Sequence, residues 1–268
     1  MPPPQRTIGT ATVIALDDGQ GGFFEPRARA FPTATADQWR AADARDPAAV
    51  SEDGEWLLRF RCFAVRLDAG PTVVVDAGIG PADAPAGSWA PTPGRLPDSL
   101  DEAGIAPDEV DAVVLTHLHT DHIGWAMHGG QPYFPNARYL MQRAELEAIR
   151  AYGAPAGPYA TEPLLAAGLL DLVDDERTIA PGLRTKHAPG HTPGHQVVLL
   201  ETGDDTVLLT GDLLVHAIQL VDPGLPYGHE MDPAEAARSR ARLLSELKSR
   251  PGRLTLATSH LGEPFVDG

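Results

Sequence analysis

The chain has little cysteine, few basic residues and no long apolar run, and each shortage excludes a class of protein. Its one cysteine, Cys62, has no partner for an internal disulfide, and the apolar stretch 60–67 around it predicts a buried thiol rather than a catalytic one. No segment approaches the roughly 18 apolar residues that a membrane-spanning helix requires. The N-terminus lacks the apolar core of a secretory signal, so we expect a cytoplasmic protein.

The charge balance argues against polyanionic partners. The 268 residues include 21 basic and 37 acidic side chains, which give a net charge of −16. A surface of this sign repels phosphate backbones and anionic membrane headgroups over about a Debye length. We therefore expect a small-molecule substrate, with neither nucleic acid nor membrane as a partner.

Glycine and proline are abundant, with 27 and 26 residues, which predicts long loops with well-marked turns. Strand and helix signals alternate between these loops, a pattern typical of layered α/β architecture. An N-cap at Asp232 followed by Pro233 marks the start of the clearest helix. The expected strands are 8–16, 57–67, 72–75, 110–115, 183–187, 207–210 and 254–258, and the expected helices are 98–103, 142–151 and 232–248.

Residues 19–54 show no sustained period and are predicted to form an N-terminal loop insertion with one short helix near 36–44. We expect residues 1–268 to form a single domain that contains this insertion. Its aromatic residues offer more apolar surface than a free loop should expose. The segment should therefore pack over the active site or against a partner subunit, with a homodimer as the simplest assembly.

The most informative motif is His117-Leu118-His119-Thr120-Asp121-His122, which places three histidines and an aspartate directly after an apolar strand. Imidazole and carboxylate groups are the ligands that suit zinc and related cations. The alternative interpretation, a solvated loop that happens to be rich in histidine, requires a rare coincidence of residue types. The motif therefore predicts a metal site.

Other histidines and aspartates follow three later strands in the same way. Strand 183–187 leads to the segment 190–195, which contains two histidines, strand 207–210 leads to Asp212, and strand 254–258 leads to His260. Side chains at the carboxyl ends of neighbouring strands converge on one edge of a sheet. Together with the first motif they suffice for two metals with open positions for water and substrate, which favours a catalytic site.

These motifs, in this order and over about residues 57–262, resemble the metallo-β-lactamase superfamily. The resemblance implies a four-layered αβ/βα sandwich with two divalent metal ions, most often Zn²⁺, between two facing sheets. It also implies that His195 has a structural role rather than a ligand role. The implied ligands are His117, His119 and His191 for one metal, Asp121, His122 and His260 for the other, and Asp212 as the bridge.

Residues 211–219 and 257–261 are similar to the branch that contains methyl parathion hydrolase and its lactonase and esterase relatives. Acyl-homoserine lactonases of this group usually place a tyrosine three residues after the bridging aspartate, where this chain has Val215. The chain therefore lacks, at that position, a phenol that would assist the lactone carbonyl or the leaving oxygen. True β-lactamases lack the aspartate that corresponds to Asp212.

The expected activity is metal-dependent hydrolysis of an ester, lactone or phosphotriester by a metal-bridging hydroxide, whose pKa two metals lower to about 7. Asp121 and Asp212 are the expected catalytic residues, Asp212 by bridging the metals and Asp121 by orienting the nucleophile. A glyoxalase-type thioesterase and a mono-iron persulfide dioxygenase on the same ligand frame are the alternatives. Metal analysis would separate the dioxygenase from the hydrolase.

Aromatic and histidine side chains near the motifs are candidates for the substrate pocket. His216 is the strongest polar candidate because it lies four residues after Asp212. The other candidates are Phe23, Phe24, Trp39, Trp125, Tyr133, Phe134, His128 and His229.

Overall fold

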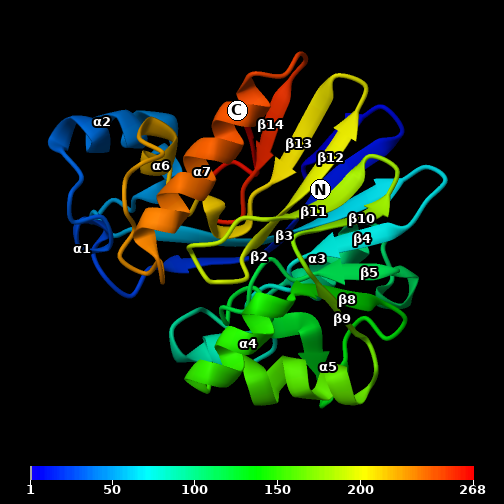
Figure 1. Ribbon diagram of the computed structural model, residues 1–268. Coiled ribbons are helices and arrows are strands. Elements are labelled where there is room, and N and C mark those ends of the chain that lie inside the picture. Colours follow the sequence, from blue (N-terminus) through cyan, green and yellow to red (C-terminus); the bar gives the residue numbers. More distant parts are fainter. Residues whose placement is uncertain (1) are drawn as a thin grey trace.

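The computed structural model describes residues 2–268 and shows two β-sheets packed face to face (Figure 1). The seven-stranded sheet has the order β1-β2-β3-β4-β5-β8-β9, and the six-stranded sheet has the order β10 to β15. The first sheet consists of β1 (Gln5–Ile8), β2 (Ala11–Gly22), β3 (Leu57–Leu67), β4 (Thr72–Val75), β5 (Ala112–Val114), β8 (Arg138–Gln142) and β9 (Leu170–Val173). The second consists of β10 (Glu176–Ala180), β11 (Leu183–His187), β12 (Gln196–Thr202), β13 (Asp205–Leu209), β14 (Leu254–Ala257) and β15 (Phe265–Asp267). A separate small hairpin is formed by β6 (Met127–His128) and β7 (Gln131–Pro132).

The central strands of each sheet are buried on both faces, which explains why they are mostly apolar. In β4, Val73 and Val75 face the other sheet, whereas Val74 packs on the helical side. In β12, Val198 belongs to the core between the sheets and Val197 to the core on the outer side. Because side chains alternate with a period of two along a strand, such sequences fill one core on each side of a sheet.

Helices cover the outer face of each sheet and confirm the predicted four-layered αβ/βα sandwich. The first sheet is covered by α3 (Leu96–Glu102), α4 (Arg143–Tyr152) and α5 (Glu162–Ala166). The second is covered by α7 (Pro233–Lys248), which lies on the opposite side of the molecule from α4 and α5 (Figure 1). The predicted cap of α7 is present, since the Asp232 carboxylate accepts a hydrogen bond from the Glu235 amide. None of the helices within residues 2–268 is long and apolar enough to cross a membrane.

The N-terminal segment contains more regular structure than the sequence predicts. Strand β2 continues through Gly22 and stays paired with β3, so the prediction of a loop is wrong for residues 19–22. The glycines at 19, 21 and 22 carry no side chains, and they therefore leave no alternating pattern to read. Two helices follow, α1 (Arg27–Ala30) and α2 (Ala36–Arg45), and the second confirms the predicted short helix. A short 3₁₀ turn (Pro47–Ala49) ends the segment.

Candidate metal centre

The site lies where four strands end on the same side of the two sheets. Strands β11, β13 and β14 run in the same direction, since β12 is antiparallel to both β11 and β13 and β14 is parallel to β13. Their carboxyl ends meet the loop that follows β5. The structure brings together all seven residues predicted as ligands, and it arranges them in two groups of ligand atoms that lie within 4.8 Å of one another. One group is His117, His119, His191 and Asp212, and the other is Asp121, His122 and His260.

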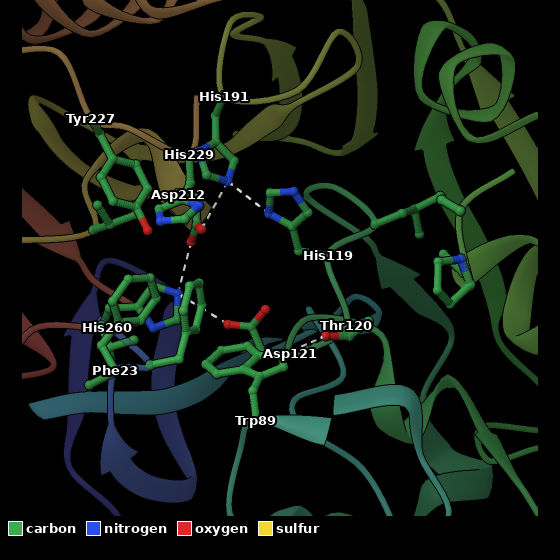
Figure 2. Close-up of a pocket in the computed structure, with 17 residues that line it drawn as sticks. Phe23, Trp89, His119, Thr120, Asp121, His191, Asp212, Tyr227, His229 and His260 are labelled. Carbon is green, nitrogen blue, oxygen red and sulfur yellow. Dashed lines mark hydrogen bonds and ion pairs between the residues drawn. The ribbon is translucent and has the colours of Figure 1, made fainter. Parts of the chain in front are cut away.

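Asp212 lies between the two groups, with one carboxylate oxygen facing each (Figure 2). Its Oδ2 atom is 3.1 Å from His191 Nε2 and 3.6 Å from His117 Nε2. Its Oδ1 atom is 2.9 Å from His260 Nε2 and 3.1 Å from His122 Nε2. This is the position expected of a carboxylate that bridges two cations.

The donor atoms fit a pair of divalent cations. His119 Nδ1 lies 3.0 Å from the Nε2 atoms of both His117 and His191, so three imidazole nitrogens converge on one point. Burial, reinforced by the neighbouring histidines, lowers the pKa of His119 to about 3 and that of His117 well below its usual range, and both rings are therefore neutral. Asp212 Oδ1 is buried and makes no hydrogen bond within residues 2–268. Converging lone pairs and an unsatisfied carboxylate oxygen are what a cation with nitrogen and oxygen ligands requires.

Three carboxylates lie close to His122 in the second group. Burial lowers the pKa of His122, but the carboxylates of Asp212, Asp121 and Asp76 raise it by more, and the net result is a pKa well above the usual value. The negative charge of these buried carboxylates can be neutralised either by a proton on the imidazole or by a divalent cation. This group is therefore also suited to binding a cation.

Asp76, which sequence reasoning missed, holds one of these histidines in place. Its Oδ2 atom accepts a hydrogen bond from His122 Nδ1 at 2.8 Å, and its Oδ1 atom accepts one from the Thr116 amide at 2.7 Å. The residue has a φ of +63°, in the left-handed region that aspartate tolerates better than most residues. The pairing fixes the His122 ring so that Nε2 faces Asp212. A signal existed, because Asp76 follows strand β4 just as the ligands follow theirs.

Glu145 links the loop that contains residues 117–122 to the loop that contains residues 190–195. Its side chain is buried, and its two oxygens accept hydrogen bonds from the amides of Leu118 (3.1 Å) and Gly194 (2.8 Å). A Cβ atom at Gly194 would lie 2.3 Å from the Glu145 amide nitrogen, so only glycine fits there. Burial raises the pKa of this carboxyl. The sequence gives no sign of this contact, since one glutamate in an amphipathic helix usually faces solvent.

The structure supports the structural role expected for His195. Its Nε2 atom accepts a hydrogen bond from the Asp212 amide at 3.0 Å, and its Nδ1 atom donates one to the carbonyl of Ala188 at 3.1 Å. Both ring nitrogens are thus occupied by backbone groups and neither points to the ligand groups.

A cavity of about 300 Å³ opens above the ligand groups. Phe23, Phe24 and His229 line it as predicted, and Trp89 and Tyr227 line it without having been predicted. No lysine or arginine within residues 2–268 lines this cavity. Its remaining walls are Leu58, Leu118, Thr120, Ala154, Pro155, Ala156 and Val215, above the ligands His119, Asp121, His191, Asp212 and His260.

The other pocket candidates belong to the core or the surface. His216 is buried among the rings of Phe31, Trp39 and Trp56, whose centroids lie 5.3–5.6 Å away. Burial lowers its pKa to about 3, and it does not line the cavity, so the structure favours a core histidine over the candidate role at the substrate. Spacing from Asp212 misled here because Val215 lines the cavity, whereas the next side chain, His216, packs among these aromatic rings. Trp125, Tyr133 and Phe134 pack in the core beneath α4 and α5, and His128 is exposed.

Comparison with known sequences agrees with this geometry. The profile of the Metallo-beta-lactamase superfamily matches residues 61–260. The chain is 34% identical over 119 residues to an N-acyl homoserine lactonase from a Bacillus species, a match that spans 44% of this chain and 44% of the lactonase. It is 30% identical over 249 residues to metallo-beta-lactamase domain-containing protein 1 of Mus musculus, which covers 91% of this chain and 82% of that protein.

Solved structures show the same fold. The hydrolase AbOPH of the beta lactamase superfamily superposes with a TM-score of 0.77 at 25% identity, covering 97% of this chain and 90% of AbOPH. The dizinc quorum-quenching lactonase AidC superposes with a TM-score of 0.78 at 21% identity, covering 97% of this chain and 91% of AidC. Since the family profile covers most of the chain and includes every residue of the two ligand groups, this chain belongs to the Metallo-beta-lactamase superfamily.

Proposed function

We propose that this protein is a dinuclear, zinc-dependent hydrolase of neutral esters and lactones that carry apolar substituents. The observation that supports this most strongly is the position of Asp212 between two ligand groups at the floor of a largely apolar cavity. Relatives named as lactonases, one of them a dizinc enzyme, point in the same direction.

The ligand groups divide the metal binding between them. His117, His119 and His191 would hold one ion and Asp121, His122 and His260 the other, with Asp212 shared. Two such ions, when bound, would supply hydroxide at neutral pH and would polarise the scissile carbonyl. Asp121 lines the cavity and accepts a hydrogen bond from the attacking water, which orients that water toward the acyl carbon.

The cavity wall selects the substrate. The rings of Phe23, Phe24 and Trp89 exclude water and contact apolar groups of the substrate, which strengthens the electrostatic interactions at the floor. Anionic substrates need a cationic partner, and the cavity wall offers none beyond the metal site, in a protein of net charge −16. This disfavours glutathione thioesters, the substrates of the glyoxalase-type alternative, relative to neutral esters.

We also propose a homodimer. Phe24, which lines the cavity, is 58% exposed, and Met231, two residues before α7, is 46% exposed. Exposed apolar surface of this kind is commonly covered by a second copy of the chain. Phe31 is fully buried within its own chain, so the N-terminal segment itself packs mainly on this protomer. Light scattering over a wide concentration range tests the assembly, and a monomer mass throughout would exclude it.

A substrate panel tests the activity. Zinc-loaded protein is assayed with phenyl acetates, a series of lactones, phosphotriesters and glutathione thioesters, and Asp212→Ala serves as the inactive control. We expect the highest kcat/KM with a neutral aryl ester or lactone, and kcat/KM increasing with the length of the apolar chain. A preference for the glutathione thioester would replace this function with the thioesterase alternative.

A further inference from the structure

The cavity contains one phenol that the proposed function does not use. Tyr227 lies in the loop between α6 (Ile218–Val221) and α7, and it lines the cavity. Its ring stacks on Phe31 with a centroid distance of 5.1 Å, and it is nearly parallel to the ring of His191 at 6.2 Å. Figure 2 shows its hydroxyl group pointing toward the Asp212 carboxylate. The phenol is therefore directed at the floor of the site rather than into the core.

Buried ion-paired side chains fix the loop that carries Tyr227. The Tyr227 amide donates a hydrogen bond to Glu230 Oε2 at 2.9 Å, and Arg240 Nη1 donates one to Glu230 Oε1 at 2.9 Å. Arg240 also donates hydrogen bonds to the carbonyl oxygens of Leu213 (3.2 Å) and Leu225 (3.0 Å). One buried guanidinium thus joins the loop of Tyr227 to the residue that follows Asp212. Such support holds a hydrogen-bond donor in a constant position relative to the reacting atoms.

Ester hydrolysis creates a negative charge on the carbonyl oxygen of the substrate. A water molecule releases a proton to the solvent, and the hydroxide that remains adds to the acyl carbon, so the π electrons of the carbonyl move onto its oxygen, which becomes negative. The carbonyl then re-forms, the bond to the leaving oxygen breaks, and that oxygen departs with the bonding electrons. Burial and the nearby carboxylates raise the pKa of Tyr227 above its usual range, so the phenol keeps its proton at neutral pH and can donate it in a hydrogen bond throughout. A donor directed at the developing charge within an apolar cavity accelerates the reaction by about 100- to 1,000-fold.

We propose that Tyr227 is a catalytic residue that donates a hydrogen bond to the carbonyl oxygen of the bound ester. The cavity has no phenol at position 215, where this chain has valine. Tyr227 supplies one from the loop before α7. This assignment rests on the proposed esterase or lactonase function, and it names the group that stabilises the developing charge.

The test compares Tyr227→Phe with the wild type and with Tyr152→Phe, which removes the same atom from a tyrosine that is 72% exposed. For substituted phenyl acetates we expect Tyr227→Phe to lower kcat by about 100-fold at similar KM, equally for every leaving group. Zinc content and thermal midpoint should match the wild type. A kcat within twofold of wild type would overturn the proposal. Loss of zinc from Tyr227→Phe would also overturn it, because the phenol would then act on the ligand Asp212. A decrease in kcat that grows with leaving-group pKa would overturn it as well, because the phenol would then act on the departing oxygen.

A binding measurement separates this proposal from the proposed function. Phenyl methylphosphonate carries charged oxygens where the attacked carbonyl oxygen would lie, and its affinity for zinc-loaded protein is measured by titration calorimetry. We expect Tyr227→Phe to weaken this affinity by at least tenfold and Tyr152→Phe to leave it unchanged. If the wild type hydrolyses no ester but shows this difference, the proposed function fails, and Tyr227 remains a hydrogen-bond donor to a bound oxyanion without the catalytic role at an ester. If the wild type hydrolyses esters and the affinity is equal in both proteins, the donor role fails alone.

Discussion

The carboxylate of Asp76 accepts a hydrogen bond from His122 Nδ1 at 2.8 Å, beneath the ligand groups. This contact leaves the opposite nitrogen, Nε2, to face Asp212 at 3.1 Å. Asp76 lies at the end of β4 and His122 in the loop after β5, and these are adjacent parallel strands. The sheet therefore sets the orientation of the ring as well as its position.

Replacing Asp76 with Asn should weaken metal binding by about 10- to 100-fold, because an amide is a poorer partner for the ligand imidazole than a carboxylate. Asparagine tolerates the positive φ at this position, so the backbone should remain unchanged. Competition with a chromophoric zinc chelator gives the affinity. Asp108→Asn, at an exposed aspartate, is the matched control. Equal affinity in Asp76→Asn and the control would show that the pairing does not support the metal.

His191 and His195 should respond in opposite ways to replacement by alanine. His191 contributes to a ligand group, so its loss should remove about one metal equivalent per chain. His195 bonds only backbone groups, so its loss should leave the metal content intact and lower the free energy of unfolding by about 1–3 kcal/mol. Elemental analysis and urea unfolding supply the two readings. Loss of metal in His195→Ala alone would reverse the assignment of this segment.

The contribution of Asp18 to the free energy of unfolding should increase as the pH falls from about 6 toward 3.8. Its buried carboxylate accepts hydrogen bonds from the amides of Ile79 and Leu96 and from the Trp125 indole. Burial raises its pKa from 3.8 to about 6, although these donors lower it. Between those two pH values the folded state holds a proton that the unfolded state has released, so stability declines as the pH rises.

The comparison protein for Asp18 is Asp18→Asn, which shares every other titrating group. The variant should be less stable at all pH values, because its side-chain NH2 group replaces one of the two carboxylate oxygens and cannot accept the hydrogen bond made to that oxygen. Its deficit should be larger at the acid end of the window than at neutral pH, by up to about 3 kcal/mol. Urea unfolding at several pH values measures the deficit. A deficit independent of pH would mean that Asp18 titrates normally.

Hydrolysis of substituted phenyl acetates by the wild type should slow as the pKa of the leaving phenol rises. Tyr227 is proposed to contact the carbonyl oxygen, so no side chain protonates the departing oxygen. The ease with which that oxygen leaves then depends on the pKa of the phenol. A steep dependence of kcat/KM on phenol pKa is the expected result. A flat dependence would point to His229, which lies 2.6 Å from Glu25 Oε1 at the cavity wall, as an acid, and His229→Gln would then restore the slope.

The ligands could be predicted from the sequence because each lies within a few residues of a recognisable strand. Runs such as 113–115 and 207–209 are strongly apolar, and the seven predicted ligands, which follow such runs, were all brought to one site. Pairing of the strands fixes where their ends lie, so local patterns sufficed for this part of the molecule.

The supporting residues could not be predicted in the same way because their partners are distant in the chain. Glu145 accepts a hydrogen bond from the amide of Gly194, and the Tyr227 hydroxyl points toward Asp212 from a loop that a buried ion pair between Glu230 and Arg240 supports. No local period encodes such contacts. His216 shows the converse error, since closeness in sequence to Asp212 did not bring it to the cavity.

The most direct test of the central claim is elemental analysis of protein purified without chelators. Seven ligand residues that divide around Asp212 predict about two equivalents of metal per chain, mostly zinc. A reproducible single equivalent of iron would contradict the dinuclear hydrolase and support the persulfide dioxygenase alternative.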